Sequence, residues 1–85
     1  MKKSLFKHYK KFLPITDKTP EVTLGEGFTP LVKSKNLSDK FNCEMFFKLE
    51  GCNPSSSFKD RGMFLAVSKA IENKKQKIIC ASTGN

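Results

Sequence analysis

The sequence of 85 residues has no long apolar run, no tryptophan and a single histidine. A membrane-spanning helix needs about 20 consecutive apolar residues, and no stretch of the chain approaches that length. The basic residues at the start are not followed by the apolar segment that a secretory signal requires. We therefore expect a cytoplasmic protein with no membrane partner.

Arginine is almost absent: Arg61 is the only one among 16 basic residues, which face 8 acidic ones and give a net charge of +8. Proteins that read nucleic acids rely on the arginine guanidinium for bidentate contacts to guanine and phosphate. Residues 1–16 contain five lysines and no acidic residue. We interpret this segment as a solvated basic arm and expect no nucleic-acid partner. The alternative is a non-catalytic basic binding module whose arm docks an acidic partner or RNA.

Cysteine is limited to Cys43, Cys52 and Cys80, an odd number without a Cys-x-x-Cys pair. His8, the one histidine, does not complete a convincing zinc site with such spacing. Cys43 and Cys80 lie in apolar runs, where a free thiol behaves as a small hydrophobic side chain. The pattern predicts buried free thiols, no disulfide framework and no metal site.

Composition and turn residues divide the chain into a basic N-terminal arm and linker, residues 1–20, and the beginning of an α/β domain, residues 21–85. Residues 5–13 are compatible with a short amphipathic helix or with an extended arm. In the rest of the chain, the apolar pattern and the turn residues predict the following elements: a glycine-rich turn at 24–30, strands at 31–33, 43–49 and 78–81, a brief helix at 34–41 capped by Ser34, and a long helix at 58–73 capped by Ser57.

The strand at 43–49, the helix at 58–73 and the strand at 78–81 form a βαβ unit in this interpretation, which implies parallel pairing and a right-handed crossover. The face of the helix that we expect to be buried comprises Met63, Val67, Ala70 and Ile71, with Phe64 beside them. Parallel strands are covered on both faces in a complete domain. Because only four residues follow the last strand, we expect the chain to be the N-terminal piece of a larger protein with an incomplete α/β fold.

The start of the long helix carries the candidate chemistry. If Ser57 caps the helix, Lys59 lies in the first turn, where the positive end of the helix dipole and burial both favour a neutral amine. A neutral lysine amine is nucleophilic and forms Schiff bases. Gly62, three residues on, lies on the same face without a side chain and leaves room for a flat ligand. An ordinary solvated lysine fits the same pattern, and Asp60 and Arg61 are expected to cap and brace the helix.

Residues 53–63, Asn-Pro-Ser-Ser-Ser-Phe-Lys-Asp-Arg-Gly-Met, closely resemble the cofactor-lysine motif of the threonine synthase family, whose members are fold-type II pyridoxal-phosphate enzymes. Three further segments resemble the family's motifs in the same order: Leu-Gly-Glu-Gly-Phe-Thr-Pro-Leu at 24–31, Lys-Leu-Glu-Gly at 48–51 and Cys-Ala-Ser-Thr-Gly-Asn at 80–85. Related serine or threonine dehydratases share the lysine but usually vary the residues around it. Four ordered motifs therefore favour threonine synthase, and a dehydratase is the alternative within the same chemistry.

The resemblance implies a fold-type II α/β fold and pyridoxal 5′-phosphate as the cofactor. It implies that Lys59 holds the cofactor as a Schiff base and moves protons, and that Asn85 hydrogen-bonds the cofactor's 3′ oxygen. Ser82, Thr83 and Gly84 are then expected to bind the carboxylate of the substrate, O-phospho-L-homoserine. The implied reaction converts this substrate and water into L-threonine and phosphate.

Two residues depart from the family's common pattern: Ser56, where many members have glycine, and Phe28, where many have asparagine. Glycine permits a positive φ, so Ser56 puts the geometry of its loop in question. In this family, the groups that hold the cofactor's phosphate and pyridine nitrogen follow well beyond residue 85. We therefore expect the isolated chain to be inactive and the remainder of a parent chain to complete the site.

Overall fold

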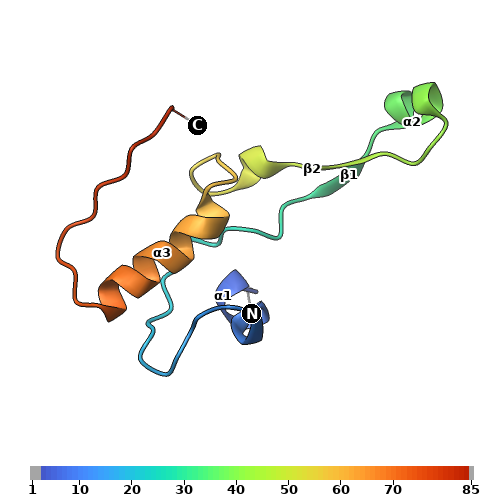
Figure 1. Ribbon diagram of the computed structural model, residues 1–85. Helices are drawn as coiled ribbons and strands as arrows, with labels where there is room; N and C mark the ends of the chain where they lie inside the picture. Colours follow the sequence, from blue (N-terminus) through green and yellow to red (C-terminus); the bar gives the residue numbers. More distant parts are fainter. Residues whose placement is uncertain (1–2, 85) are drawn as a thin grey trace.

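A computed structural model describes residues 3–84 of the chain, which forms an elongated arrangement of short elements around one longer helix (Figure 1). Its dimensions are 52 × 30 × 21 Å. The elements in chain order are α1 (Leu5–His8), η1 (Lys10–Phe12), β1 (Leu31–Lys33), α2 (Lys35–Phe41), β2 (Phe46–Lys48), η2 (Glu50–Cys52) and α3 (Asp60–Glu72), where η denotes a 3₁₀ helix.

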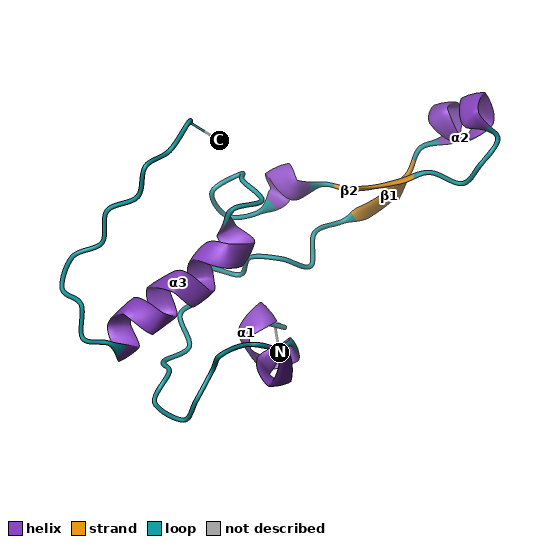
Figure 2. Cartoon of the chain, in the orientation of Figure 1, coloured by secondary structure: helices purple, strands orange, loops and turns teal. Residues whose placement is uncertain are grey.

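The two strands form an antiparallel ribbon that carries α2 at its tip (Figure 2). Val32 of β1 lies opposite Phe47 of β2, with the neighbouring residues paired in the same register. Ser34 caps α2, because its hydroxyl accepts a hydrogen bond from the Leu37 N–H at 3.3 Å. The strand at 31–33 and the brief helix behind Ser34 are confirmed, and the strand expected at 43–49 is shorter, covering 46–48.

The predicted βαβ unit is wrong for the part of the chain that the structure describes. Residues 78–81 form no strand, and β2 pairs antiparallel with β1 instead of parallel with 78–81. Every described residue from 73 to 84 is exposed. A parallel strand is stable when both its faces are covered, and within residues 3–84 nothing covers this segment.

The small core lies where α1 meets α3. Leu5 and Phe6 of α1 and Phe64 of α3 are the large apolar side chains that are buried among residues 3–84, and the partly buried apolar side chains packed against them are Leu13, Ile15 and Leu65. The N-terminal residues therefore form a short helix that packs on α3. The division of the chain at residue 20 stays a prediction.

The long helix begins at Asp60, two residues later than expected, and Ser57 is not its N-cap. Lys59 occupies the N-cap position without a capping side-chain hydrogen bond, and the Ser57 hydroxyl accepts from the Lys59 N–H at 3.1 Å. The helix begins later because residues 57–60 form turns that are tighter than those of an α-helix. The Asp60 N–H donates to the Ser57 carbonyl and the Arg61 N–H to the Phe58 carbonyl, which are both i to i+3 hydrogen bonds.

The buried face of α3 is shifted towards Phe64, which we expected beside it. Its centre is Phe64 and Ser68, whereas Met63 and Val67 are half-buried and Ile71 is exposed. The fully buried Ser68 hydroxyl donates to the Phe64 carbonyl at 2.7 Å and accepts from the Val22 N–H at 3.3 Å. The chain around Val22 and α1 thus cover one side of the helix and leave the Met63 side partly open.

The expected burial of Cys43 and Cys80 is wrong, because both thiols and that of Cys52 are free and exposed. The core is too small to take up the apolar runs in which these residues lie. Among residues 3–84, no helix has the length and the apolar character needed to cross a membrane.

Candidate active site

The carboxylate of Glu50 joins three separate segments beside the start of α3. It accepts hydrogen bonds from Arg61 through Nε at 2.6 Å and Nη2 at 3.0 Å, and from the Thr29 hydroxyl at 2.6 Å. The bidentate hydrogen bonds of Arg61, followed by that of Thr29, lower the pKa of Glu50 from 4.5 to about 2. The same carboxylate raises the pKa of the Arg61 guanidinium. This pair is therefore ionised throughout the physiological pH range.

Asn53 extends this arrangement to the glycine-rich turn. Its buried side-chain amide donates to the Glu50 backbone carbonyl at 3.0 Å and to the Glu50 carboxylate at 3.1 Å. Its oxygen accepts from the Gly27 N–H at 2.8 Å. We call Thr29, Glu50, Asn53 and Arg61 the Glu50 network. It holds the segment at 24–30, η2 and the start of α3 together.

Lys59 lies between two residues that are each bound to another part of the chain. Asp60 accepts hydrogen bonds from the Ser55 N–H at 2.8 Å and from the Ser55 hydroxyl. On the other side, Arg61 binds Glu50. Lys59 itself is half-buried at the N-cap of α3. Its backbone is therefore fixed on both sides by polar contacts from the loop that precedes the helix.

The candidate substrate-binding residues lie in an exposed segment after α3. This segment turns back after the helix and runs for most of its length on a separate path, drawn in red in Figure 1. The Gly84 N–H donates to the Ser82 hydroxyl at 3.1 Å, and Gly84 has a φ of +95°, which glycine adopts without strain. Asn85 lies outside the described residues. The roles of Ser82, Thr83, Gly84 and Asn85 stay predictions.

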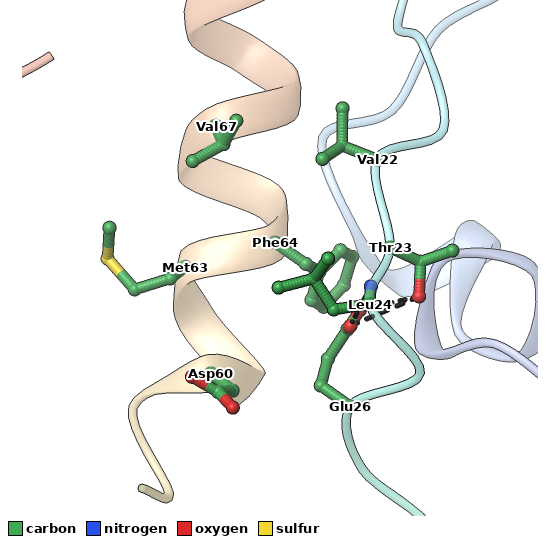
Figure 3. A pocket seen from close by; sticks show the side chains of 8 residues that line it. All are labelled: Val22, Thr23, Leu24, Glu26, Asp60, Met63, Phe64 and Val67. Atoms are coloured by element: carbon green, nitrogen blue, oxygen red, sulfur yellow. Dashed lines mark hydrogen bonds between the residues drawn. The ribbon is translucent and has the colours of Figure 1, made fainter. Parts of the chain in front are cut away.

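An apolar hollow of about 200 Å³ lies on the partly open side of α3 (Figure 3). Met63 and Val67 line it from the helix, and Val22 and Leu24 line it from the facing segment. Glu26 accepts hydrogen bonds from the Thr23 hydroxyl and the Leu24 N–H at its edge. Lys59 is not among the lining residues, so this hollow does not contain the candidate chemistry.

Comparison with known proteins shows which family the chain belongs to. The family model described as "Pyridoxal-phosphate dependent enzyme" matches residues 22–85. The chain belongs to the pyridoxal-phosphate-dependent enzyme family. This result confirms the resemblance that the four motifs indicate.

Several curated proteins that resemble the chain are threonine synthases. That of Halalkalibacterium halodurans is 54% identical over 83 residues, which cover 98% of this chain and 23% of the relative. That of Bacillus sp. (strain ULM1) is 52% identical over 85 residues, covering 100% of this chain and 24% of the relative. The threonine synthase of Methanocaldococcus jannaschii is 45% identical over 78 residues, which cover 91% of this chain and 19% of the relative. The chain thus spans about a quarter of the length of the first two relatives.

Membership of the family implies pyridoxal 5′-phosphate as the cofactor, and the residues around Lys59 fit such a group. The helix begins with a half-buried lysine, whose amine is the group that a pyridoxal aldehyde requires. A Cβ placed on Gly62 meets no atom of a neighbouring segment within 4 Å, so open space adjoins the first turn of α3. These features agree with the expectation that Gly62 leaves room for a flat ligand.

The family's sequence motifs identified Lys59 but gave no role to Glu50. We expected Arg61 to brace its own helix, and it instead binds Glu50 and Thr29 on other segments. One signal was present: Arg61 is the only arginine in a chain that otherwise uses lysine. Its planar fork suits a carboxylate that must be held bidentately. The partner was not identifiable, since nothing in the sequence brings residues 50 and 61 together.

Proposed function

We propose that residues 1–85 form part of a threonine synthase, a pyridoxal-phosphate-dependent lyase that converts O-phospho-L-homoserine and water into L-threonine and phosphate. The observation that carries this proposal is the identity of 54% and 52% to two threonine synthases over at least 98% of the chain. The enzyme would work in the cytoplasm on a small-molecule substrate.

The proposed roles are those that the resemblance to the threonine synthase family implies. Pyridoxal 5′-phosphate, when bound, supplies an electron sink for carbanion chemistry. Lys59 holds the cofactor through its Nζ atom and carries protons to and from the substrate carbons. The hydroxyls of Ser82 and Thr83 and the N–H of Gly84 hold the substrate carboxylate, and Asn85 donates to the cofactor's 3′ oxygen. Residues of the remainder of the parent chain complete the cofactor site.

A chimera tests the proposal. Residues 1–85 replace the matching segment of the Halalkalibacterium halodurans threonine synthase, and the product is assayed for threonine and phosphate formation from O-phospho-L-homoserine. We expect turnover, and we expect borohydride to fix the cofactor to the peptide that contains Lys59. Lys59→Ala should abolish both, whereas Lys75→Ala, at an exposed lysine after α3, should leave both unchanged.

Two results would overturn the proposed function. One is full activity in the Lys59→Ala chimera. The other is a folded chimera that releases ammonia from threonine and no phosphate from O-phospho-L-homoserine, which would indicate a dehydratase of the same family.

A further inference from the structure

The Glu50–Arg61 ion pair closes the loop that contains Lys59. Glu50 lies in η2 and Arg61 in the first turn of α3, and the two side chains meet through two hydrogen bonds of 2.6 and 3.0 Å. The ten residues between them include Asn53, whose amide binds Glu50 a third time. Lys59 lies two residues before the point of closure. This pair therefore helps to set the path of the backbone at Lys59, together with the Asp60–Ser55 hydrogen bonds.

The start of α3 lacks the usual side-chain cap. The N-cap residue is Lys59, and no side chain caps the helix. The loop before it contains Ser56 with a φ of +61°, a left-handed conformation that persists only when the surroundings impose it. The Ser56 N–H donates to the carbonyl of Asn53, a member of the Glu50 network, at 2.8 Å, and the neighbouring Ser55 N–H donates to Asp60.

We propose that Glu50 is a positioning residue for Lys59, acting through Arg61. The proposal rests on the proposed function, in which Lys59 holds the cofactor and moves protons. Glu50 touches neither substrate nor cofactor: its carboxylate holds Arg61, and Arg61 lies in the first turn of the helix whose N-cap is Lys59. Displacement of a reacting group by about 1 Å costs up to about 100-fold in rate.

The test compares Glu50→Gln, Arg61→Gln and the double variant Glu50→Gln/Arg61→Gln in the chimera. We expect each single variant to lower kcat and the rate of cofactor capture by Lys59 about 10- to 100-fold. KM for O-phospho-L-homoserine should stay within about threefold, because Glu50 does not bind the substrate. The double variant should be no slower than the worse single variant, since both act through one contact.

A second readout needs no cofactor. The N–H groups of Gly62 and Met63 both donate to the Lys59 carbonyl, at 3.1 and 3.0 Å, and report directly on the first turn. In the cofactor-free chimera, Glu50→Gln should speed amide hydrogen exchange at these two residues by at least about tenfold. Glu44→Gln is the matched control, because Glu44 pairs with Lys33 at 3.5 Å on the exposed ribbon.

The milder variant Thr29→Val keeps the test decisive where Glu50→Gln fails to fold. It removes the hydroxyl that donates to Glu50 and accepts from Arg61 and leaves the ion pair, so capture should slow about threefold. The proposal is overturned if folded Glu50→Gln captures the cofactor and turns over within twofold of the unsubstituted chimera. Where Glu50→Gln does not fold, the same result in Thr29→Val overturns it. Additive losses in the double variant would also overturn it. If the unsubstituted chimera captures no cofactor on Lys59, the proposed function itself fails, and this inference fails with it.

Discussion

Ser56 and Phe28 both adopt left-handed backbone conformations, with φ values of +61° and +47°. They are the two motif residues that we expected to depart from the family's common pattern. A side chain with a Cβ atom pays about 1–2 kcal/mol for this conformation. The sequence questioned the loop at Ser56 because glycine is the residue suited to a positive φ, and Ser56 does adopt a positive φ. Phe28 is strained in the same way, because it also carries a Cβ atom in a left-handed conformation.

Replacing Ser56 by glycine should stabilise the chain. We expect Ser56→Gly to raise the free energy of unfolding by up to about 1 kcal/mol, because glycine adopts a positive φ without strain. The measurement is the urea midpoint of the two chains. Gln76→Gly, at an exposed loop residue without a positive φ, should lower the midpoint slightly. Equal losses in both variants would contradict the prediction.

Glu50 should make stability depend on pH in acid. Its pKa is about 2 in the folded chain and 4.5 ordinarily, so its carboxylate stabilises the fold above pH 4.5. That contribution is lost as the pH falls from 4.5 towards 2. Hydrogen bonds from Lys69 and then Thr19 lower the pKa of Glu72, so its contribution to the stability of the fold is also lost as the pH falls in acid.

The measurement is the urea midpoint of the chain and of Glu50→Gln at pH 6, 4 and 2.5. The gap between the two should be widest at pH 6 and should narrow strongly by pH 2.5, as the pH approaches the pKa of about 2 that Glu50 has in the folded chain. A gap that stays constant over this range would show that the charge of Glu50 does not stabilise the fold.

Among the elements, those with local determinants were predictable. The Ser34 cap specifies α2 through its own hydroxyl, and the body of α3 follows from its apolar spacing. The absence of a strand at 78–81 was not predictable, because strand formation depends on neighbouring strands that the sequence does not reveal. The sequence placed Lys59 in the first turn of α3, whereas the structure places it at the N-cap, one residue before the helix begins. The partner of Arg61 was not predictable, since the contact joins two elements across a loop.

The turn before β1 should tolerate no side chain at Gly27. Its φ is +81°, and a Cβ there would lie 2.7 Å from Cδ2 of the buried Leu5. We expect Gly27→Ala to destabilise the chain by about 1–3 kcal/mol. The matched control is Gly62→Ala, in a helix with open space around it, which should stabilise by about 0.5–1 kcal/mol. Urea midpoints that move in the same direction would contradict this account.

At the scale of the whole molecule, apolar surface remains uncovered. Ile79 is 96% exposed, Leu24 78% and Phe12 73%, whereas three large apolar side chains are buried in the described chain. The threonine synthase relatives are about four times as long as the segment that matches this chain. The interactions that order residues 78–84 in such an enzyme are therefore expected from outside these 85 residues.

The isolated chain should accordingly be inactive where the chimera is active. With pyridoxal 5′-phosphate and borohydride, we expect the isolated chain to be modified at low yield across its 15 lysines, because Lys59 lacks a completed site. The chimera should be modified stoichiometrically at Lys59. Peptide mass spectrometry distinguishes the two patterns. Turnover of O-phospho-L-homoserine by the 85 residues alone would contradict this prediction.

The antiparallel ribbon of β1 and β2 has a consequence for handling the protein. No third strand joins it in the described chain, so each outer edge offers backbone N–H and C=O groups to any extended polypeptide. Phe46 and Phe47 add exposed aromatic surface to the same ribbon. The brevity of the strands and the charge of Lys33 are what oppose stacking of one ribbon on the next. We therefore expect the chain to aggregate at high protein concentration and high salt, where the repulsion between lysine side chains is screened.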